Sequence, residues 1–324
     1  MPSSSNRCEM IEVTRAPGLI TVQDSGRPGH RANGVPHSGV MDCVTAATLN
    51  CMLGNERGAA MLELALGDAR FEFDGETVLA CGGAGANSTL NNAPLTDYTA
   101  YFAERGDVLM VRATGEARFT YLAFAGGIDC EQLLGSRSTY LPGGWGGIGG
   151  RSLARGDRIA LQRKRHAPPR VPLPDALRPS RDTRPIRIVP RSPSHQTTLT
   201  SLVESSFTMS RASDRTGYRL DGAAISGGAS IVSEPVCPGV IQLPPGGQPI
   251  VLMADAPTIG GYKSLGCVIT ADRSMLAQIP VGSGVAFEII SIEQAESARV
   301  QQDLSLTAVE AWFRLTLREE SSRT

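Results

Sequence analysis

Short apolar segments separated by turn residues recur along the whole chain, and they constrain its fold more than any other feature. Each segment is four to six residues long and is bounded by Gly, Pro or Asp. Segments of this length with such boundaries are typical of β-strands. The sequence therefore predicts a mainly β protein, with strands at residues 18–22, 70–73, 77–80, 107–111, 119–124, 186–189, 240–243, 249–253 and 285–290.

Turn residues are distributed along the chain, and helices are few. The 36 Gly and 21 Pro are not gathered in one tract, which indicates many tight turns rather than a disordered tail. Asp42 is a favourable N-cap for a helix over residues 43–53, which Gly54 would end. Two more helices are predicted, over residues 194–204 and over residues 306–317, where apolar positions have helical periodicity.

A segment rich in proline and arginine divides the chain. Residues 163–185 contain six prolines, and proline neither donates to a sheet ladder nor continues a helix. This segment is therefore predicted to be a linker. The predicted organisation is an N-terminal β domain over 10–165, a linker over 166–185, a C-terminal β domain over 186–295 and a C-terminal helical tail over 296–324.

One local pattern, Arg-x-Gly-ring-Arg-x-x-Gly, occurs in both halves, at residues 27–34 and 215–222. The repetition suggests that the halves arose by duplication, although a pattern of this length also arises by chance. Closely spaced arginines beside glycines can present forked donors to carboxylates, phosphates or carbonyl oxygens. The alternative is a surface salt bridge with the preceding acidic residue, Asp24 or Asp214.

Charge and cysteine content exclude several classes of function. The net charge is -1, so the chain is not expected to bind nucleic acid or an acidic membrane surface. Seven cysteines lack CxxC spacing and a neighbouring histidine, so no metal site is predicted and a reduced compartment is favoured. The polar N-terminus and the lack of a long apolar run favour a cytoplasmic protein.

The segment 254–263 holds the densest set of residue types used in catalysis. Asp255, Thr258, two glycines, Tyr262 and Lys263 follow directly after a predicted strand. A carboxylate, a hydroxyl and a phenol at a strand end are typical of an active site, and the alternative is a hairpin turn with a capping aspartate.

A second glycine-rich segment offers a different chemistry. Residues 143–150 contain six glycines, which could form an anion-binding nest or a lid that carries Trp145. The segment lacks the ending of a P-loop. A biotinylation motif is also missing from the chain, so any ATP or biotin chemistry is not carried by this chain alone.

Histidine and serine give no hydrolase motif. His30 and His37 lie in one glycine-rich loop, where either could act as an acid or base. Ser38 follows His37, but the surrounding residues do not form a Gly-x-Ser-x-Gly elbow. A serine hydrolase triad is therefore not predicted.

Several motifs in unbroken order from about residue 10 to 295 together resemble a known family. They are VQDSGRPG at 22–29, GVPHSGVMD at 34–42, LE at 62–63, AGGID at 125–129, LGSRST at 134–139, SDRTGYRL at 213–220, GVIQ at 239–242, GQPI at 247–250 and DAPTIGGY at 255–262. The family is the biotin-dependent carboxyltransferase-like group, which includes the C subunit of 5-oxoprolinase, allophanate hydrolase subunit 2, KipA and the matching part of urea carboxylase.

The resemblance implies two cyclophilin-like β-barrel domains with a few short helices. It implies a non-autonomous component of an ATP-dependent amide-processing enzyme, with 5-oxoprolinase preferred, in which the chain acts with the B subunit (KipI-like) and the A subunit of that enzyme. ATP would be used through the partner complex. One alternative is carboxyl transfer from carboxybiotin to an amide, as in urea carboxylase or allophanate hydrolase subunit 2. Another is a KipA-type regulator that binds an inhibitor of a sensor kinase.

The residues and the resemblance together predict a site that grips a small, planar amide. We expect the segment from Asp255 to Tyr262 to face the arginines of residues 215–222. Catalytic roles are predicted for Asp255, Tyr262, Asp214 and Arg215. Substrate-binding roles are predicted for Asp24, Arg27, Ser38, Asp42, Arg219, Gln242, Gln248, Thr258, Gly260 and Gly261.

Overall fold

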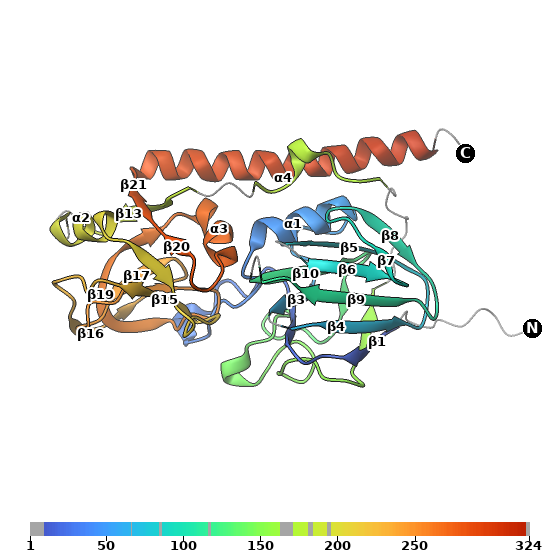
Figure 1. Cartoon of the computed structure of the whole chain (residues 1–324), viewed down its shortest axis with the longest axis horizontal. Coiled ribbons are helices and arrows are strands. Elements are labelled where there is room, and N and C mark those ends of the chain that lie inside the picture. Colours follow the sequence, from blue (N-terminus) through green and yellow to red (C-terminus); the bar gives the residue numbers. More distant parts are fainter. Residues whose placement is uncertain are drawn as a thin grey trace, which may run out of the picture. The chain divides into compact units, whose positions relative to one another are not determined.

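The computed structural model describes residues 10–65, 67–83, 86–115, 118–162, 171–180, 184–192 and 196–321. These residues form two compact units. Unit one comprises the chain up to Ser25, Cys43–Pro179 and the chain from Ser305, while unit two comprises Gly26–Asp42 and Ser180–Leu304. Strands dominate both units, as predicted (Figure 1). Ser194 and parts of the predicted linker, 163–170 and 181–183, lie outside the described residues.

The predicted domain boundaries at 165, 185 and 295 stay predictions. The division between the units after Pro179 falls inside the predicted linker. The structure adds that residues 26–42, which were placed in the N-terminal domain, group with unit two.

Unit one is built from two antiparallel sheets. In the described residues, one sheet has the order β11 (Ile128–Asp129), β12 (Arg158–Leu161), β1 (Met10–Arg15), β4 (Ala69–Phe73), β9 (Val108–Ala113), β6 (Ala86–Leu90), β7 (Ala93–Pro94). The other has the order β2 (Leu19–Gln23), β3 (Met61–Ala65), β10 (Phe119–Phe124), β5 (Thr77–Gly83), β8 (Ala100–Ala103).

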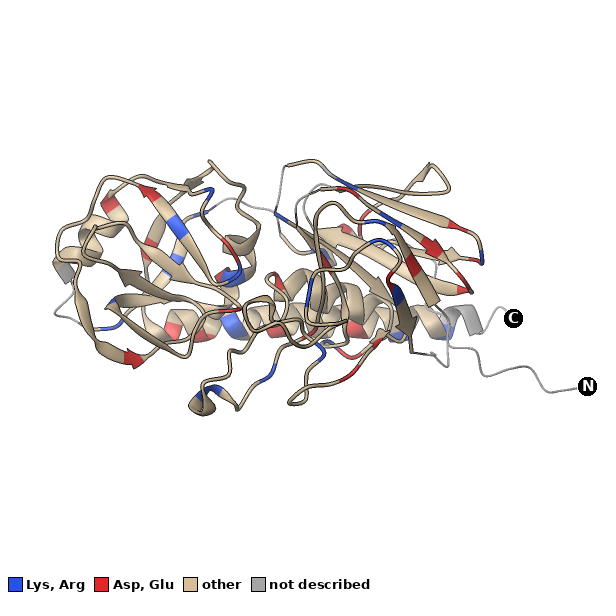
Figure 2. Cartoon of the chain, turned by 90° about the horizontal axis from the view of Figure 1, so that it is seen from below, with Lys and Arg blue, Asp and Glu red and all other residues tan. Residues whose placement is uncertain are grey.

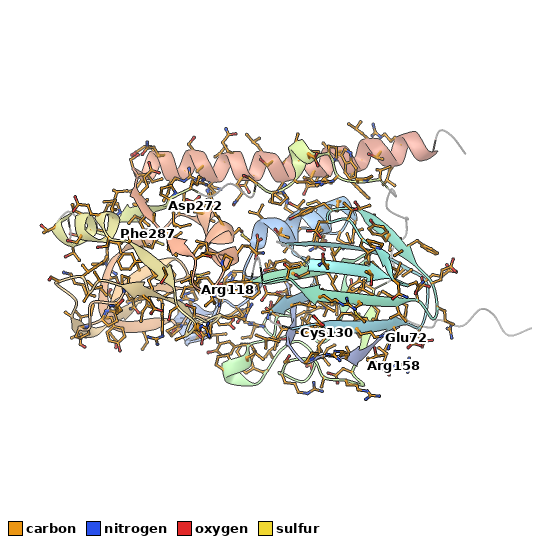
Figure 3. The ribbon with its side chains drawn as sticks, in the orientation of Figure 1. Glu72, Arg118, Cys130, Arg158, Asp272 and Phe287 are labelled. Carbon is orange, nitrogen blue, oxygen red and sulfur yellow. The ribbon has the colours of Figure 1, made fainter. Side chains whose placement is uncertain are left out.

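The core of unit one lies between these sheets. Strand β4 buries Phe71 and Phe73 and exposes Arg70 and Glu72, because alternate side chains point to opposite faces of a sheet. Glu72 is labelled in Figure 3. Strand β10 is buried at every position. One of its faces meets the core, and helix α1 (Cys43–Met52) packs on β10 and β5. This helix ends before Gly54, whose φ is 65°, so the predicted helix is confirmed.

Unit two contains one large sheet. In the described residues its order is β20 (Gly284–Val285), β14 (Phe207–Met209), β15 (Gly217–Gly222), β18 (Ile250–Leu252), β17 (Val240–Leu243), β19 (Ile259–Val268), β13 (Ile186–Pro190), β21 (Phe287–Ile289), with β16 (Ser230–Pro235) paired to β19. The two ends of this order, β20 and β21, are separated in sequence only by Ala286. The sheet therefore curves into a nearly closed barrel, which leaves few exposed strand edges.

Helices α2 (Gln196–Glu204) and α3 (Arg273–Gln278) also belong to unit two. Helix α2 packs against β21 and confirms the predicted helix. The carboxylate of Asp272, which lies directly before α3 (Figure 3), is fully buried and accepts hydrogen bonds from Arg184 at 2.7 and 3.0 Å. Arg187 donates to the same carboxylate at 2.7 and 3.0 Å. Two guanidinium groups thus fix α3 to the start of β13.

The C-terminal helix α4 (Ile292–Ser321) begins fourteen residues before the predicted start at 306 and is 30 residues long. Its start is fixed by a capping box. The backbone N–H of Gln294 donates to the hydroxyl of Ser291 at 3.3 Å, and the backbone N–H of Ser291 donates to the amide oxygen of Gln294 at 2.9 Å. Among the described residues, no helix is both long enough and apolar enough to cross a membrane.

Candidate functional site

A loop of unit two, residues 26–42, carries several of the predicted substrate-binding residues. The backbone N–H of Ser38 donates to the carbonyl of Ala254 at 3.0 Å. The guanidinium of Arg31 donates to the carbonyl of Pro257 at 2.9 Å. These hydrogen bonds anchor the loop to the segment directly after β18. This segment, 254–263, is the one in which the sequence analysis found the most residue types used in catalysis.

Arg215 and Asp255 form a buried ion pair next to this loop. The carboxylate accepts from the Nε and Nη2 atoms of Arg215 at 2.9 and 3.1 Å, and the side chains are only 5% and 1% exposed. Arg215 Nη2 also donates to the carbonyl of Gly39 at 2.7 Å. Forked, charge-assisted hydrogen bonds of this kind are strong. Because both groups are buried and bonded, their geometry fits positioning of the loop, and their catalytic role stays a prediction.

Ser38 is the unusual residue of the loop. Its φ is 54°, a conformation that costs energy for a residue other than glycine. Its side chain is buried at 3% exposure, and its hydroxyl has no hydrogen-bond partner among the described residues. Buried hydroxyls nearly always have a partner. A strained backbone and an unsatisfied hydroxyl at one residue are typical of a ligand contact.

The side chains of Asp214 and Arg219 lie at the surface of unit two. The Asp214 carboxylate accepts from the backbone N–H groups of Thr216 and Gly217 at 2.8 and 3.1 Å and so shapes a tight turn. The predicted turn at 215–222 is short, because strand β15 begins at Gly217. Arg219 lies on this strand with its side chain exposed, and its binding role stays a prediction.

The two copies of the arginine pattern adopt different structures. Residues 27–34 form a loop with one short 3-10 turn, η1 (Arg31–Asn33), whereas 215–222 is a turn followed by a strand. Both copies also lie in unit two. The pattern therefore gives no structural support to a duplication of the two halves.

Gln242, Gly260 and Tyr262 lie together on the paired strands β17 and β19. The side-chain amide of Gln242 donates to the carbonyl of Tyr262 at 3.4 Å. A Cβ atom at Gly260 would lie 2.4 Å from that amide nitrogen, so the glycine makes room for Gln242. The Tyr262 side chain is 40% exposed. Because β19 begins at Ile259, Gly260 and Tyr262 of the segment 254–263 are part of a strand.

Two other predicted residues, Gln248 and Thr258, contact the backbone around these strands, and Gly261 lies within β19. Gln248 donates to the carbonyl of Gly222 at 2.9 Å. The carbonyl of Thr258 accepts from the backbone N–H of Val236 at 3.1 Å. Gly261 is half-buried in β19. These contacts hold the strands in place, and binding roles for the three residues stay predictions.

Two buried charged residues of the loop complete the predicted set in unit two. The Arg27 side chain is fully buried. The Asp42 carboxylate accepts from the side-chain amide of Gln278, on α3, at 2.9 Å. The bond to Gln278 fixes the end of the loop at Asp42, and binding roles for Arg27 and Asp42 stay predictions.

Asp24 is the one predicted site residue that belongs to unit one. Its carboxylate accepts from the hydroxyls of Ser136 and Ser138 at 2.6 and 2.5 Å and from the backbone N–H of Arg137 at 2.5 Å. Hydrogen bonds of this kind stabilise a buried carboxylate. Asp24 thus holds the 134–139 motif in unit one, and a contact with substrate stays a prediction.

The glycine-rich segment 143–150 is a folded turn with internal hydrogen bonds. The N–H groups of Gly144, Gly147 and Gly150 each donate to a nearby carbonyl at 3.0 Å. The rings of Tyr140 and Trp145 pack at a centroid distance of 5.1 Å. These N–H groups are therefore not available to an anion, which weighs against a nest. The lid hypothesis concerns movement and stays a prediction.

Replacement of Gly150 by alanine is expected to destabilise unit one by about 2 kcal/mol more than the same change at Gly144. Both residues have similar φ values, 66° and 68°. A Cβ atom at Gly150 would lie 2.0 Å from the carbonyl oxygen of Gly144, whereas a Cβ atom at Gly144 would meet nothing within 4 Å. Urea unfolding of the two variants measures the difference. Equal losses would show that only the backbone angle matters.

Arg31 and Gly39 were not among the predicted site residues, although both lie in motifs that the sequence displays. Arg31 is the second arginine of the 27–34 pattern, and its guanidinium anchors the loop. Gly39 supplies the carbonyl that receives Arg215. Basic and acidic residues are interleaved over both units (Figure 2), so recognition of a ligand rests on local groups of this kind rather than on a broad field.

The comparison with known families identifies the class of protein. The family model for the carboxyltransferase domain, subdomains A and B, matches residues 33–289. The chain belongs to this carboxyltransferase-domain family, and the resemblance found in the sequence is confirmed.

Two 5-oxoprolinase C subunits and one urea amidolyase are similar to this chain. The chain is 36% identical over 299 residues to the 5-oxoprolinase C subunit of Escherichia coli (strain K12), covering 90% of this chain and 95% of that protein. It is 33% identical over 305 residues to the 5-oxoprolinase C subunit of Haemophilus influenzae, covering 93% and 97%. The structure of K. lactis urea amidolyase matches with a TM-score of 0.87 at 27% identity, over 95% of this chain. This chain spans only 20% of that protein.

Proposed function

We propose that this chain is the component of a 5-oxoprolinase that helps to bind and open a cyclic amide, 5-oxoproline, and that it acts with the A and B subunits of that enzyme as partners. The choice of substrate rests on the two 5-oxoprolinase relatives, which are similar over nearly their whole length. The observation that supports a binding site in this chain is that Ser38 has a strained backbone and a buried, unsatisfied hydroxyl.

The proposed site uses the residues of unit two in two roles. The Ser38 hydroxyl hydrogen-bonds the planar amide of the substrate, which would satisfy its buried oxygen. The exposed side chains of Asp214, Arg219 and Tyr262 supply further polar contacts. The Arg215–Asp255 pair is a positioning element that holds Gly39, and therefore Ser38, in place. Water adds to the amide carbon, the carbon–nitrogen bond breaks, and the nitrogen takes a proton.

Coupling to ATP is assigned to the partner subunits. The glycine-rich turn 143–150 uses several of its N–H groups internally, so it does not fit the phosphates of a nucleotide. ATP, when bound in the complex, would supply the free energy for opening the amide. The residues of this chain would bind and orient the substrate.

Carboxyl transfer is the second candidate, because the fold is that of the matching part of urea amidolyase. Biotin on a partner would supply an activated carboxyl group. The Ser38 hydroxyl fits the oxygen of a ureido ring or of urea as well as that of a lactam. Dependence of turnover on a biotinylated partner, and its loss with avidin, would favour this candidate over 5-oxoproline hydrolysis.

Conversion of 5-oxoproline to glutamate is expected only when this chain, both partner subunits and ATP are present. Ser38→Ala is expected to lower kcat on the order of 100-fold, by analogy with the removal of one preorganised hydrogen-bond donor. Its free energy of unfolding should change by less than about 0.5 kcal/mol, because the hydroxyl has no partner to lose among the described residues.

The matched control is Thr197→Ala, which removes an exposed hydroxyl on α2 and should leave turnover unchanged. Glutamate formation is followed with the complete mixture in each case. No turnover of 5-oxoproline in the full mixture would overturn the substrate. Normal turnover in Ser38→Ala would overturn the role of the hydroxyl.

A further inference from the structure

Two cysteines of unit two, Cys237 and Cys267, lie side by side on neighbouring segments. Cys237 lies in the turn before β17, and its carbonyl accepts from the backbone N–H of Val240 at 3.1 Å. Val240 in turn pairs with Cys267 across β17 and β19. The sulfurs of Cys237 and Cys267 are close enough to share a proton, and the Cys267 thiol also contacts the carbonyl of Val268 at 3.4 Å. Both thiols are free.

A glycine in the turn allows this close approach. Gly239 has a φ of 97°, which favours glycine over other residues. A Cβ atom there would lie 3.0 Å from the sulfur of Cys267 and 2.9 Å from the carbonyl of Val268. The turn therefore leaves no room for a side chain between β19 and the chain that carries Cys237.

Two arginines complete the surroundings of Cys237. Arg31, from the loop 26–42, donates to the carbonyl of Val236, directly before Cys237. Its Nη1 atom is buried without a hydrogen-bond partner among the described residues. Arg273, at the start of α3, is the second cation close enough to act on the sulfur. An anionic sulfur at Cys237 would satisfy this cationic environment.

The pKa of Cys237 agrees with the geometry. The hydrogen bond from Cys267 lowers it to about 6, with further help from the charges of Arg31 and Arg273, although partial burial opposes the shift. The pKa of Cys267 is raised, mainly because its thiol donates that hydrogen bond. By contrast, burial raises the pKa of Cys130 to about 11 and that of Cys51 to about 12. The thiolate is the reactive form of cysteine.

We propose that Cys237 and Cys267 form an oxidant-sensitive dithiol, in which Cys237 reacts with peroxides and Cys267 resolves the product as a disulfide. The exposure of Cys237 and the half-burial of Cys267 fit an attacking and a resolving cysteine, respectively. The site uses neither Ser38 nor the Arg215–Asp255 pair, and it shares with the proposed function only Arg31, which anchors the loop 26–42.

The reaction balances in two steps. The Cys237 thiolate attacks one peroxide oxygen, the O–O bond breaks, and the leaving oxygen takes a proton as water or an alcohol. Cys237 is thereby oxidised to a sulfenic acid while the peroxide is reduced. The Cys267 sulfur then attacks the Cys237 sulfur, an S–S bond forms, and the S–O bond breaks with loss of water. A small dithiol reductant reverses the bond by thiol–disulfide exchange.

The first test is peptide mapping by mass spectrometry after treatment of the full chain with hydrogen peroxide. The expected product is one disulfide that joins the peptides of Cys237 and Cys267, with a mass lower by two hydrogen atoms. In Cys267→Ser the sulfenic acid at Cys237 should accumulate and be captured by dimedone. Equal labelling of Cys130 (Figure 3) or Cys51 would overturn the proposal. Full disulfide formation in Cys130→Ser is the control.

The second test is the pH dependence of alkylation by iodoacetamide, followed for each cysteine peptide. Cys237 should show a midpoint well below that of Cys130 and below the ordinary value for a cysteine thiol. At neutral pH it should react on the order of 50-fold faster than Cys130, after allowance for the lower nucleophilicity of a less basic thiolate.

Paired substitutions separate the causes of this reactivity. Cys267→Ala removes the hydrogen bond and should move the midpoint upward, whereas Cys267→Ser keeps a donor and should move it less. Arg273→Met should also raise the midpoint, and it leaves the anchor made by Arg31 intact. A midpoint for Cys237 that is unchanged in all three variants, or that lies near the ordinary value of ~8.5 in the unmodified chain, would overturn the proposal.

Discussion

Asp255→Ala is expected to lower the free energy of unfolding by about 3–5 kcal/mol, because it leaves the buried guanidinium of Arg215 without its carboxylate. The pair has two hydrogen bonds and almost no exposed surface. The carbonyl of Gly39 would remain as an acceptor, but a carbonyl carries no full negative charge to offset the guanidinium. Urea unfolding of the full chain measures the loss.

Matched variants separate an unpaired charge from a loss of packing. Asp221→Ala removes an exposed carboxylate of β15 and should change stability by less than about 0.5 kcal/mol. The double variant Arg215→Met, Asp255→Leu removes both charges and should recover much of the loss, because apolar replacements of buried pairs are often nearly neutral. If the single and double variants are equally unstable, the charge is not the cause. Loss of activity in Asp255→Ala would then reflect the loop as well as any chemistry.

Asp272→Asn is expected to cost about 3 kcal/mol at neutral pH, because two arginines lose a buried ionised partner. Burial alone would raise the pKa of Asp272, but hydrogen bonds from Arg187 and Arg184 outweigh it and hold the pKa below its ordinary value. When the pH falls to about the pKa of an aspartate in the unfolded chain, ~3.9, the unfolded chain binds a proton at Asp272 that the folded chain does not yet bind. The stability from this group is therefore fully present above that pH and is lost as the pH falls through the folded pKa.

The measurement is the free energy of unfolding between about pH 2.5 and about pH 7. The unmodified chain should lose stability steeply at the acidic end, by up to ~1.4 kcal/mol per pH unit from this group. Asp272→Asn should start lower and show a flatter acidic limb. Asp175→Asn is the control, because that carboxylate is 91% exposed in its ion pair with Arg178. An identical acidic slope in Asp272→Asn and the unmodified chain would rule out the role given to Asp272.

The sequence was sufficient for elements whose signals are local. Strands β10 and β17 are short apolar runs between turn residues, and α1 lies between Asp42 and Gly54. Strand β19 was not predicted, because it contains three glycines, which normally weaken a strand. The start of α4 was not predicted because its first turns are mostly polar and lack the regular apolar positions found over residues 306–317.

The candidate site depends on contacts between distant parts of the chain, and these are the least predictable. The motifs pointed to Ser38, Arg215 and Asp255 separately. Ser38 binds the carbonyl of Ala254, more than two hundred positions away, and nothing in either motif specifies that partner. For the same reason, the sequence did not predict that Cys237 and Cys267 lie close together, because their proximity depends on the pairing of β17 with β19.

Residues 26–42 belong to unit two although they precede most of unit one in the sequence, and this has a consequence for synthesis and for engineering. This stretch leaves the ribosome early, yet the carbonyl of Ala254 and the guanidinium of Arg215 that receive it emerge much later. The barrel of unit two therefore completes its fold only with residues 26–42, which come from the early part of the chain. Cleavage in the proline-rich segment would not yield two fragments that fold independently, because the C-terminal fragment would lack the loop 26–42 that carries Ser38.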